Sequence, residues 1–324
     1  MKNHEHIFFL FIVVFFASCA MNNKLKTIEE DTSSVVYYGA DNSGKEDASE
    51  AFRNALSSRH IMITVPRGRY IINETIELKK HLRLMPGVVI TKTKQGNDGP
   101  VFWLSKSYSK LEGLNKRVEI KSERSVPNGI LKIGHKDKRV VGKNILYAEV
   151  SNLTITGPGT SETSTNIGFH LFNAQAKGDA STTSFFHTIY NVVIQHLDCG
   201  ILLEGMANAN SINNVILNRI GNGTNDTAIQ LKGAMENRIF DVFHHYSKNA
   251  TTLLLENYKD QNGAVIKPCY NYVTQVVSEQ GGEYAKCADI RSGYSNSIGV
   301  LCNAKGGNVT YDKFEKDKNV MLIN

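Results

Sequence analysis

The chain has 324 residues, of which 41% are hydrophobic and 21% charged, a composition typical of a globular protein. Only residues 7–17 form a continuous apolar run, which is too short to span a membrane twice, so a multi-span membrane protein is excluded. The net charge of +6 is spread thinly, without a basic run of the kind that follows a phosphate backbone, so nucleic acid is not expected as a partner.

The N-terminal segment has the pattern of an export signal. An apolar stretch over residues 7–16 is followed by the small residues of a cleavage site, which predicts a signal peptide over residues 1–18. Phe16-Ala-Ser-Cys19 resembles the lipobox of bacterial lipoproteins, although Phe16 stands where Leu is usual. That resemblance implies a lipid on Cys19 and an outer-membrane or periplasmic-face lipoprotein; the alternative is an ordinary secreted protein. Residues 19–33 are polar and aperiodic, as expected of a tether.

Four further cysteines would share the oxidising environment of an exported protein, where disulfides persist. Three pairings are possible and the sequence does not choose among them. The cysteines lack CxxC or His spacing, so we expect no metal site from them. They are Cys199, Cys269, Cys287 and Cys302.

The rest of the chain reads as short strands. One amphipathic helix is predicted over residues 46–57, and elsewhere runs of three to six apolar or β-branched residues alternate with Gly, Asn, Pro and charged turns. This pattern predicts an all-β architecture. The first such runs are residues 61–65, 70–72, 75–78, 82–84 and 88–90.

A repeat runs through the second half of the chain. Five asparagines, each followed by an apolar strand, recur at spacings of 23, 23, 34 and 25 residues and predict equivalent turns: Asn191, Asn214, Asn237, Asn271 and Asn296. The residues two and six places after each Asn are expected to face inward, so Val193 and Phe243 would both lie in the core. A second apolar row follows in each unit, at residues 201–203, 229–231, 253–255 and 288–290.

One unit is too small to bury its own apolar face, so the units must stack. Stacking predicts a single-domain parallel β-helix over residues 34–324, right-handed because parallel crossovers have that hand. Stacked Asn amides would hydrogen-bond along the axis. The 34-residue interval predicts an inserted loop near residues 258–268, and irregular insertions are expected over residues 92–144 and 157–184. A row of alternating charge after the second strand predicts a cross-strand ladder: Glu204, Lys232, Glu256 and Arg291.

A family resemblance supports this fold. Residues 35–44 (VVYYGADNSG), the predicted helix, and residues 63–72 (ITVPRGRYII) are similar to the opening of the pectate-lyase-like superfamily. The departure is at residues 41–47, which replace the usual DGxxDD run. The resemblance implies a right-handed parallel β-helix whose short helix caps the coil stack, and a carbohydrate-active protein. The residues themselves indicate no cofactor, and calcium is implied by the resemblance alone.

The motifs of the polygalacturonase-like members are not intact here. NTD, DD and GHG are missing, and the nearest match, residues 223–227 (GTNDT), lacks the carboxylate pair needed to protonate a leaving group and activate water. No cluster of carboxylates suited to an ion stands out either. Two function classes stay open: an enzyme that cleaves or epimerises an acidic polysaccharide, and a non-catalytic glycan-binding or structural β-helix.

The densest set of proton-transferring groups is Asp241-Val-Phe-His244-His245-Tyr246. We predict Asp241, His244 and His245 as catalytic candidates in a groove along the coils that begin at Asn214, Asn237 and Asn271. Phe243 is expected inward, and a turn after it would free His245 from that side, so His245 is favoured over its neighbour as the groove-facing histidine. The alternative is a polar corner without a ligand.

Neighbouring coils would supply the substrate-binding groups. The candidates are Asn218, Gln275, Glu279 and Tyr246. The residues four places after each repeated Asn are expected side by side: Gln195, Asn218, Asp241 and Gln275. The resemblance and the mild positive charge together imply an acidic polysaccharide as the partner, with the membrane reached only through the lipid on Cys19.

Overall fold

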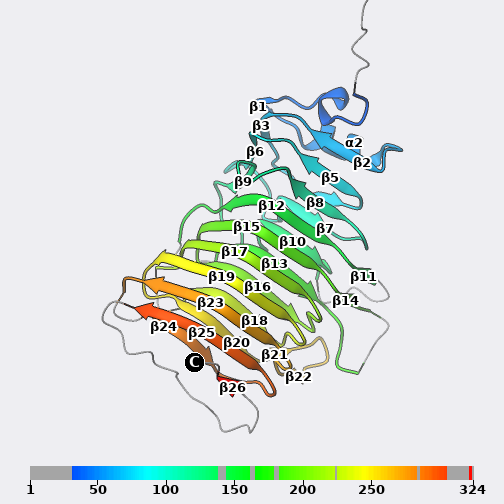
Figure 1. The fold of residues 1–324 in the computed structure, drawn as a ribbon. Helices are drawn as coiled ribbons and strands as arrows, with labels where there is room; N and C mark the ends of the chain where they lie inside the picture. Colours follow the sequence, from blue (N-terminus) through cyan, green and yellow to red (C-terminus); the bar gives the residue numbers. More distant parts are fainter. Residues whose placement is uncertain are drawn as a thin grey trace, which may run out of the picture. The chain divides into compact units, whose positions relative to one another are not determined.

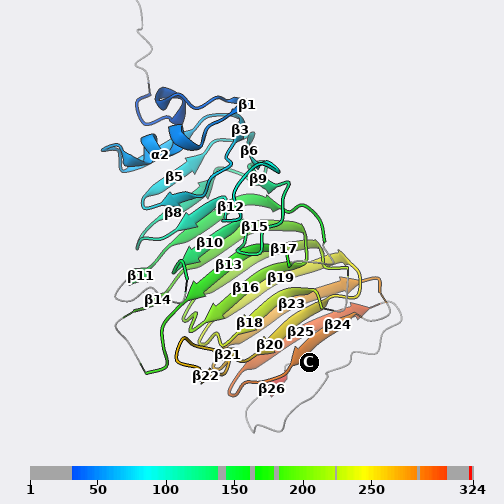
Figure 2. The ribbon, with the colours of Figure 1, turned by 180° about the vertical axis from the view of Figure 1, so that it is seen from behind.

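The computed structural model describes residues 31–137, 144–160, 165–178, 182–222, 225–282, 285–304 and 321–322. Cys19, the predicted signal peptide and most of the predicted tether lie outside these residues. No described helix is long and apolar enough to cross a membrane. The unit described here comprises Ser33–Asn324, seen from two sides in Figures 1 and 2.

The chain winds into parallel coils that form two large sheets (Figure 1). The eight-stranded sheet consists of β4 (Ile76–Leu78), β7 (Phe102–Leu104), β10 (Leu131–Gly134), β13 (Ile167–Asn173), β16 (Cys199–Gly205), β18 (Thr227–Lys232), β20 (Thr251–Glu256) and β24 (Lys286–Ile290). Every strand in it pairs in parallel with its counterpart one coil away.

The fourteen-stranded sheet forms the other two faces of the coils. Its strands are β1 (Ser43–Asp47), β2 (Met62–Val65), β3 (Gly68–Ile71), β5 (His81–Leu84), β6 (Val88–Lys92), β8 (Lys110–Gly113), β9 (Glu119–Ser122), β12 (Glu149–Thr156), β15 (Thr188–Leu197), β17 (Ser211–Ile220), β19 (Arg238–Ser247), β23 (Tyr272–Gln280), β25 (Ser297–Ala304) and β26 (Met321–Leu322). In the first coils the two faces are separate strands, and both β8 and β9 pair with β12. From β12 onward one long, bent strand serves both faces. The chain therefore has the expected right-handed parallel β-helix fold.

Short elements cap and decorate the stack. The 3-10 helix η1 (Val35–Tyr38) and the helix α2 (Ser49–Ser57) cover the first coil, where Phe52 packs edge-on against Tyr70. The predicted helix is confirmed from Ser49, but the residues before it form β1 instead. Two-stranded sheets join β11 (Ile145–Leu146) to β14 (Ser184–Phe185) and β21 (Tyr258–Lys259) to β22 (Val265–Ile266). The hairpin β21–β22 is the predicted insertion.

The core is a set of apolar rows that run along the axis. One row consists of Ile189, Ile212, Ile239, Val273 and Ile298, all buried and paired coil to coil. Each such side chain contributes about 1.5–3 kcal/mol by leaving water. The rows at residues 201–203, 229–231, 253–255 and 288–290 also stack as predicted.

The repeated asparagines form two rows, not one. Asn191 and Asn214 lie at the bend of the long strands, with positive φ, in register with Asp241 and Gln275. The other three belong to a buried ladder on a different corner: Asn210, Asn237, Asn271 and Asn296. The prediction of five equivalent turns is therefore wrong.

The reason is that both positions select Asn. The bend needs a left-handed residue, which Asn tolerates, and the buried turn needs an amide that bonds along the axis. Four extra residues between the coils of Asn214 and Asp241 shift the phase, giving an interval of 27 rather than 23. Because Asn191 and Asn214 stand at the bend, the residue directly after each one is buried, as Val192 and Val215 show, whereas Val193 and Ile216 face outward.

Two predicted insertions are more regular than expected. Residues 92–144 contain the strands β7 to β10, and residues 157–184 contain β13, all in register with the coils around them. Their apolar runs are short because each strand occupies one narrow face. The predicted charge ladder is confirmed: Lys232 bonds Glu204 at 3.1 Å, and Arg291 lies 3.5 Å from Glu256.

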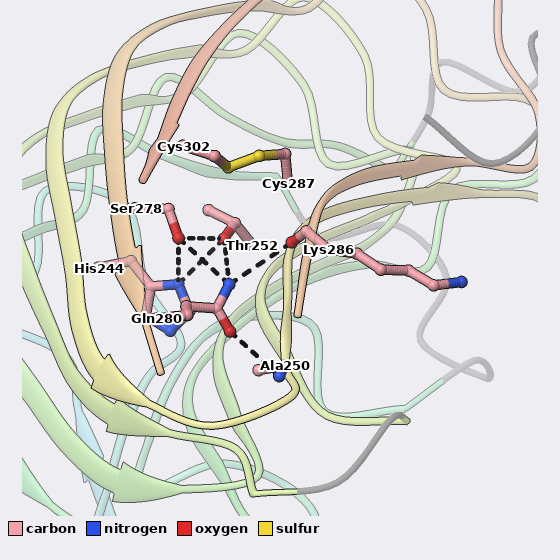
Figure 3. Close-up of a disulfide and its surroundings, with 8 residues drawn as sticks. All are labelled: His244, Ala250, Thr252, Ser278, Gln280, Lys286, Cys287 and Cys302. Atoms are coloured by element: carbon pink, nitrogen blue, oxygen red, sulfur yellow. Dashed lines mark hydrogen bonds between the residues drawn. A yellow bond between two sulfur atoms is a disulfide. The ribbon is translucent and has the colours of Figure 1, made fainter. Parts of the chain in front are cut away.

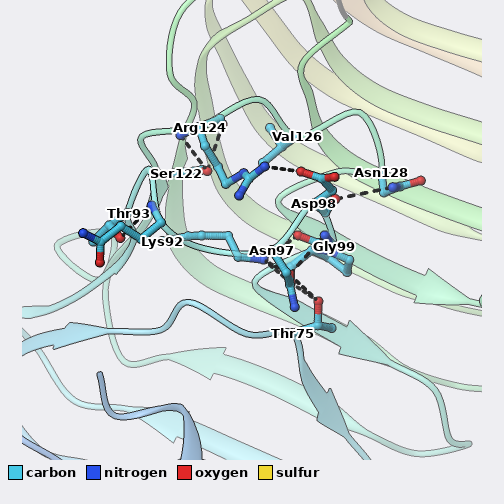
Figure 4. A network of polar contacts seen from close by, with 12 residues as sticks. Thr75, Lys92, Thr93, Asn97, Asp98, Gly99, Ser122, Arg124, Val126 and Asn128 are labelled. Atoms are coloured by element: carbon cyan, nitrogen blue, oxygen red, sulfur yellow. Dashed lines mark hydrogen bonds and ion pairs between the residues drawn. The ribbon is translucent and has the colours of Figure 1, made fainter. Parts of the chain in front are cut away.

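A buried lysine fixes the loop after β6 (Figure 4). The Lys92 ammonium donates to Asn97 Oδ1 at 2.7 Å and to the Gly99 carbonyl at 2.6 Å, and burial lowers its pKa to about 8. Asp98 of the same loop pairs with Arg124 one coil further. This network holds a structural loop in place and leaves Lys92 without access to a ligand.

One disulfide joins Cys287 to Cys302, whose Cα atoms are 5.9 Å apart, across the last described coil (Figure 3). Cys199 and Cys269 are free and buried. The structure thus selects the Cys287–Cys302 pair, which the sequence left open, because these two residues lie close together within one coil.

Candidate functional site

The predicted site residues separate into two rows on the fourteen-stranded sheet. Asp241 lies at the bend between Asn214 and Gln275. Asn218, His245 and Glu279 form another row, together with Gln195. Asp241 and His245 are four residues apart along one strand, roughly 13 Å. The structure therefore does not bring Asp241 and His245 together. The expected row of four divides into two pairs in register, Gln195 with Asn218 and Asp241 with Gln275.

The two adjacent histidines face opposite sides of β19. Phe243, expected inside, points outward, so His245 is on the outer side with it, their ring centroids 5.0 Å apart. Tyr246 is exposed, 4.4 Å from the His245 ring. Burial lowers the pKa of His245, against the attraction of Glu279. His245 is thus the accessible member of the pair, as predicted. The cause is that Phe243 lies on the outer side, whereas the prediction assumed that it lies inside.

His244 is fully buried inside the coil (Figure 3). Its Nε2 lies 2.7 Å from Ser247 Oγ and its Nδ1 lies 3.1 Å from Thr252 Oγ1. Thr252 and Gln280 extend this network, and burial lowers the pKa of His244 to about 4. A neutral imidazole enclosed in this way cannot contact a polysaccharide, so His244 is a core residue.

A surface groove of about 950 Å³ lies on the same coils, but on the half of the long strands before the bend. Its floor and walls include Phe186, Glu236, Arg238, Tyr270 and Tyr272. None of these residues is a sequence-predicted site residue. The groove is thus one face away from the predicted His245 row.

The groove interrupts a row of aromatic side chains at one corner of the coils, here called the aromatic corner. The row occupies one position per coil: Tyr108, Tyr147, Phe186, Ala209, Glu236, Tyr270 and Ser295, all with φ between 52° and 62°. Tyr108, Tyr147 and Phe186 stack face to face with 5.3 Å between ring centroids. Ala209 and Glu236 carry no ring, and their coils form the groove.

The charged groups of the groove are exposed and available. Among the described residues, neither the Glu236 carboxylate nor the Arg238 guanidinium has a side-chain hydrogen bond or ion pair. They lie two residues apart on one coil, so both point outward on the same face. The site thus combines an open aromatic face, a hydrogen-bond acceptor and a planar cation.

Two other polar clusters do not form accessible sites. Ser184 Oγ lies 2.8 Å from His187 Nε2, but both residues are buried. His187 Nδ1 accepts from the Ala148 amide, so Nε2 carries the proton and cannot take one from Ser184. Ser184 and His187 therefore cannot act as a catalytic nucleophile and its general base.

The second cluster lies on the eight-stranded sheet. Glu204 bonds both His170 and Lys232 at 3.1 Å. Although burial opposes its ionisation, these partners lower the pKa of Glu204 to about 2. The neighbouring Lys132 is buried and donates to the Lys136 carbonyl. Within the described part of the chain, no three His, Cys, Asp or Glu side chains gather as metal ligands, so no calcium site can be assigned.

The groove could not be predicted from a sequence motif, because its only sign in the sequence is a recurrence of aromatic residues at unequal intervals. The recurrence of aromatic residues just before a long strand, at Tyr108, Tyr147, Phe186 and Tyr270, was the available sign. Their intervals differ widely, so only the coil register aligns them.

No family model matches the chain, and no curated protein matches it. Three solved structures are similar. The surface protein and adhesin PfbA of Streptococcus pneumoniae has 14% identity and a TM-score of 0.56, covering 84% of this chain and 86% of that one. The iota-carrageenase of family GH82 from A. fortis has 16% identity and a TM-score of 0.47, with 81% and 55% covered. The mannuronan C-5 epimerase AlgE4 A-module of Azotobacter vinelandii has 12% identity and a TM-score of 0.41, with 83% and 76% covered. The likeness to the adhesin agrees with the parallel β-helix fold and extends no further.

Proposed function

We propose that the protein binds a polysaccharide in the groove of the aromatic corner. The observation that carries this proposal is the pair of ring-free coils between Phe186 and Tyr270, with Glu236 and Arg238 exposed and without a side-chain partner there. Sugars expose C–H faces that pack on aromatic rings and hydroxyls that bond carboxylates. A guanidinium binds a carboxylate through two parallel hydrogen bonds, which favours an acidic glycan.

The test is binding to a panel of uronic-acid and neutral polysaccharides, measured by calorimetry. We expect an acidic member to bind, and Phe186→Ala and Arg238→Ala each to weaken it at least tenfold. Tyr37→Ala removes an equally exposed ring outside the groove and should leave the affinity unchanged. Absence of binding across the panel would refute the proposal.

A second candidate is an enzyme that cleaves or epimerises the same class of polymer. The observation in its favour is the row of Asn218, His245 and Glu279 on three consecutive coils, because a neutral histidine beside a carboxylate can act as a base. The polysaccharides are incubated with the protein and followed near 235 nm for unsaturated ends and by reducing-sugar assay. His245→Ala and Glu279→Gln should each lower activity at least tenfold, about 1.4 kcal/mol in barrier. Wild-type turnover in both variants would exclude this row.

We further propose export and lipid anchoring through Cys19. The signal-like N-terminus supports export, and a disulfide between Cys287 and Cys302 is of the kind that persists outside the reducing cytoplasm. Cys19→Ser followed by membrane fractionation is expected to release the protein to the soluble fraction. Unchanged membrane association would refute lipidation at this residue.

A further inference from the structure

We infer that the groove is a gap in a column of rings, and that a saccharide ring fills it as the next rung against Phe186. Tyr147 is then a positioning residue that holds the Phe186 ring in place. This inference rests on the proposed polysaccharide binding, which it extends to the pose of the ligand and to residues that do not touch it.

The column begins with three rings. The angle between the ring planes is 18° for Tyr108 and Tyr147 and 14° for Tyr147 and Phe186, so the three rings are nearly parallel. Stacking covers both faces of Tyr147 and one face of Phe186. The other face of Phe186 is directed toward the next coil, where Ala209 offers only a methyl group.

The backbone continues the column without interruption. Phe186 and Ala209 have φ of 60° and 53°, and the Phe186 amide donates to the carbonyl of Asn208. Ala209 and Glu236 thus occupy rungs that a ring could fill, and only their side chains open the space. From Phe186 to Tyr270 is three inter-strand spacings of roughly 4.8 Å, about 14 Å. Two ring-shaped groups fit in that length.

The groups around the gap match one face and one edge of an acidic sugar. The C–H face of a pyranose ring packs on the open face of Phe186, replacing water with apolar contact. Its hydroxyls reach Glu236 as acceptor, and its carboxylate reaches Arg238 on the adjoining strand. The gap thus favours a six-membered sugar ring with an apolar C–H face and a negatively charged substituent.

The column also explains why Phe186 can serve as a platform although it lies at the surface. A free aromatic side chain at an exposed corner would lose rotamer freedom on binding and weaken the complex. Tyr147, held between two rings, fixes the plane of Phe186 before the ligand arrives. Its contribution is therefore pre-organisation.

The first test fills the gap with the protein's own ring. Ala209→Tyr places a side chain in a backbone conformation that Tyr147 and Tyr270 already adopt, so folding is retained. We expect it to weaken binding of the panel's tightest acidic polysaccharide at least tenfold, with Ala209→Ser as the matched control at wild-type affinity. Thermal unfolding of both variants reports the fold.

The second test asks whether the aromatic ring of Tyr147 is needed, or only an apolar side chain of similar size. Tyr147→Leu keeps an apolar side chain but removes the ring, and should weaken binding three- to tenfold, whereas Tyr147→Phe should restore wild-type affinity. Full affinity in Ala209→Tyr or in Tyr147→Leu, with loss in Arg238→Ala, would overturn this inference and leave the proposed function standing. Absence of binding by the wild type would overturn both.

Discussion

At the scale of single residues, side-chain direction in β19 decides what the two histidines can do. His245 faces outward beside Phe243, whereas His244 is enclosed with Ser247 and Thr252. The alternation of a strand puts them on opposite faces, and the left-handed residue Asp241 sets which face is which. A one-residue change of phase would have exchanged their environments.

The buried His244 predicts a loss of stability in acid. Burial lowers its folded pKa to about 4, so below pH 6.5 the unfolded state takes up a proton first. The stability it contributes is complete above pH 6.5 and lost as the pH falls to about 4, roughly 3 kcal/mol. Urea unfolding at pH 7 and pH 4 should show a smaller acid loss in His244→Gln than in the wild type. Equal losses in both proteins would contradict the prediction.

At the scale of elements, asparagine has a different structural role in the buried ladder than in the row at the bend. Asn271 accepts from the amide and side chain of Asn237 and donates to Asn296, all within 3.1 Å. At the bend, Asn214 is exposed and donates only to Asn191. The first row satisfies buried backbone groups, and the second supplies a left-handed conformation.

Removal of one rung should therefore cost more in the buried row. Asn271→Ala leaves the Asn237 backbone amide without an acceptor and removes one of the two hydrogen bonds to the Ala234 carbonyl, so it should destabilise the fold by about 3 kcal/mol. Asn214→Gly, which keeps the left-handed backbone, should change the unfolding free energy by less than about 1 kcal/mol. The measurement is chemical denaturation of both variants. A larger effect of Asn214→Gly would show that the bend row is the dominant ladder.

The charge ladder on the eight-stranded sheet gives a second prediction at this scale. Lys232 lies between Glu204 and Glu256, so Lys232→Glu puts three like charges in one row and should destabilise the protein by about 1–2 kcal/mol. Lys232→Gln, which only removes the attraction, should cost less than about 1 kcal/mol. Urea midpoints at low and high salt measure the difference, which should shrink in high salt. A salt-independent effect would refute the electrostatic cause.

At the scale of the whole molecule, the interior changes character toward its C-terminal end. Aliphatic rows give way to the polar network of His244, Thr252, Ser278 and Gln280, and then to the disulfide one coil later (Figure 3). The cross-link joins β24 to β25 across the coil. It therefore holds the end of a stack in which the buried side chains are less apolar.

Loss of this cross-link should weaken the C-terminal coils. The closed loop spans 15 residues, for which the entropic contribution is about 3 kcal/mol. The wild type should unfold at lower urea concentration when a reductant is present. The double variant Cys287→Ser/Cys302→Ser should show that lower midpoint with or without reductant. A reductant effect of the same size in the double variant would exclude this disulfide as its source.

The sequence by itself determined the repeat and hence the fold, because units too small to bury an apolar face must stack. It also predicted the capping helix, the loop inserted near residues 258–268 and the charge ladder, since each depends on local pattern and on coil order. The accessibility of His245 was expected as well, but from an inward Phe243, which the structure places on the outer side.

Only the tertiary structure decided the register between coils. Asn serves at two corners, so sequence spacing alone could not show that Asn237 belongs with Asn210 and not with Asn214. The groove depends on that register, because Phe186, Ala209 and Glu236 become neighbours only when coils of unequal length are aligned. Paired residues of neighbouring coils are 23 residues apart at one step and 39 at another, because insertions at the corners change that separation without changing the stack.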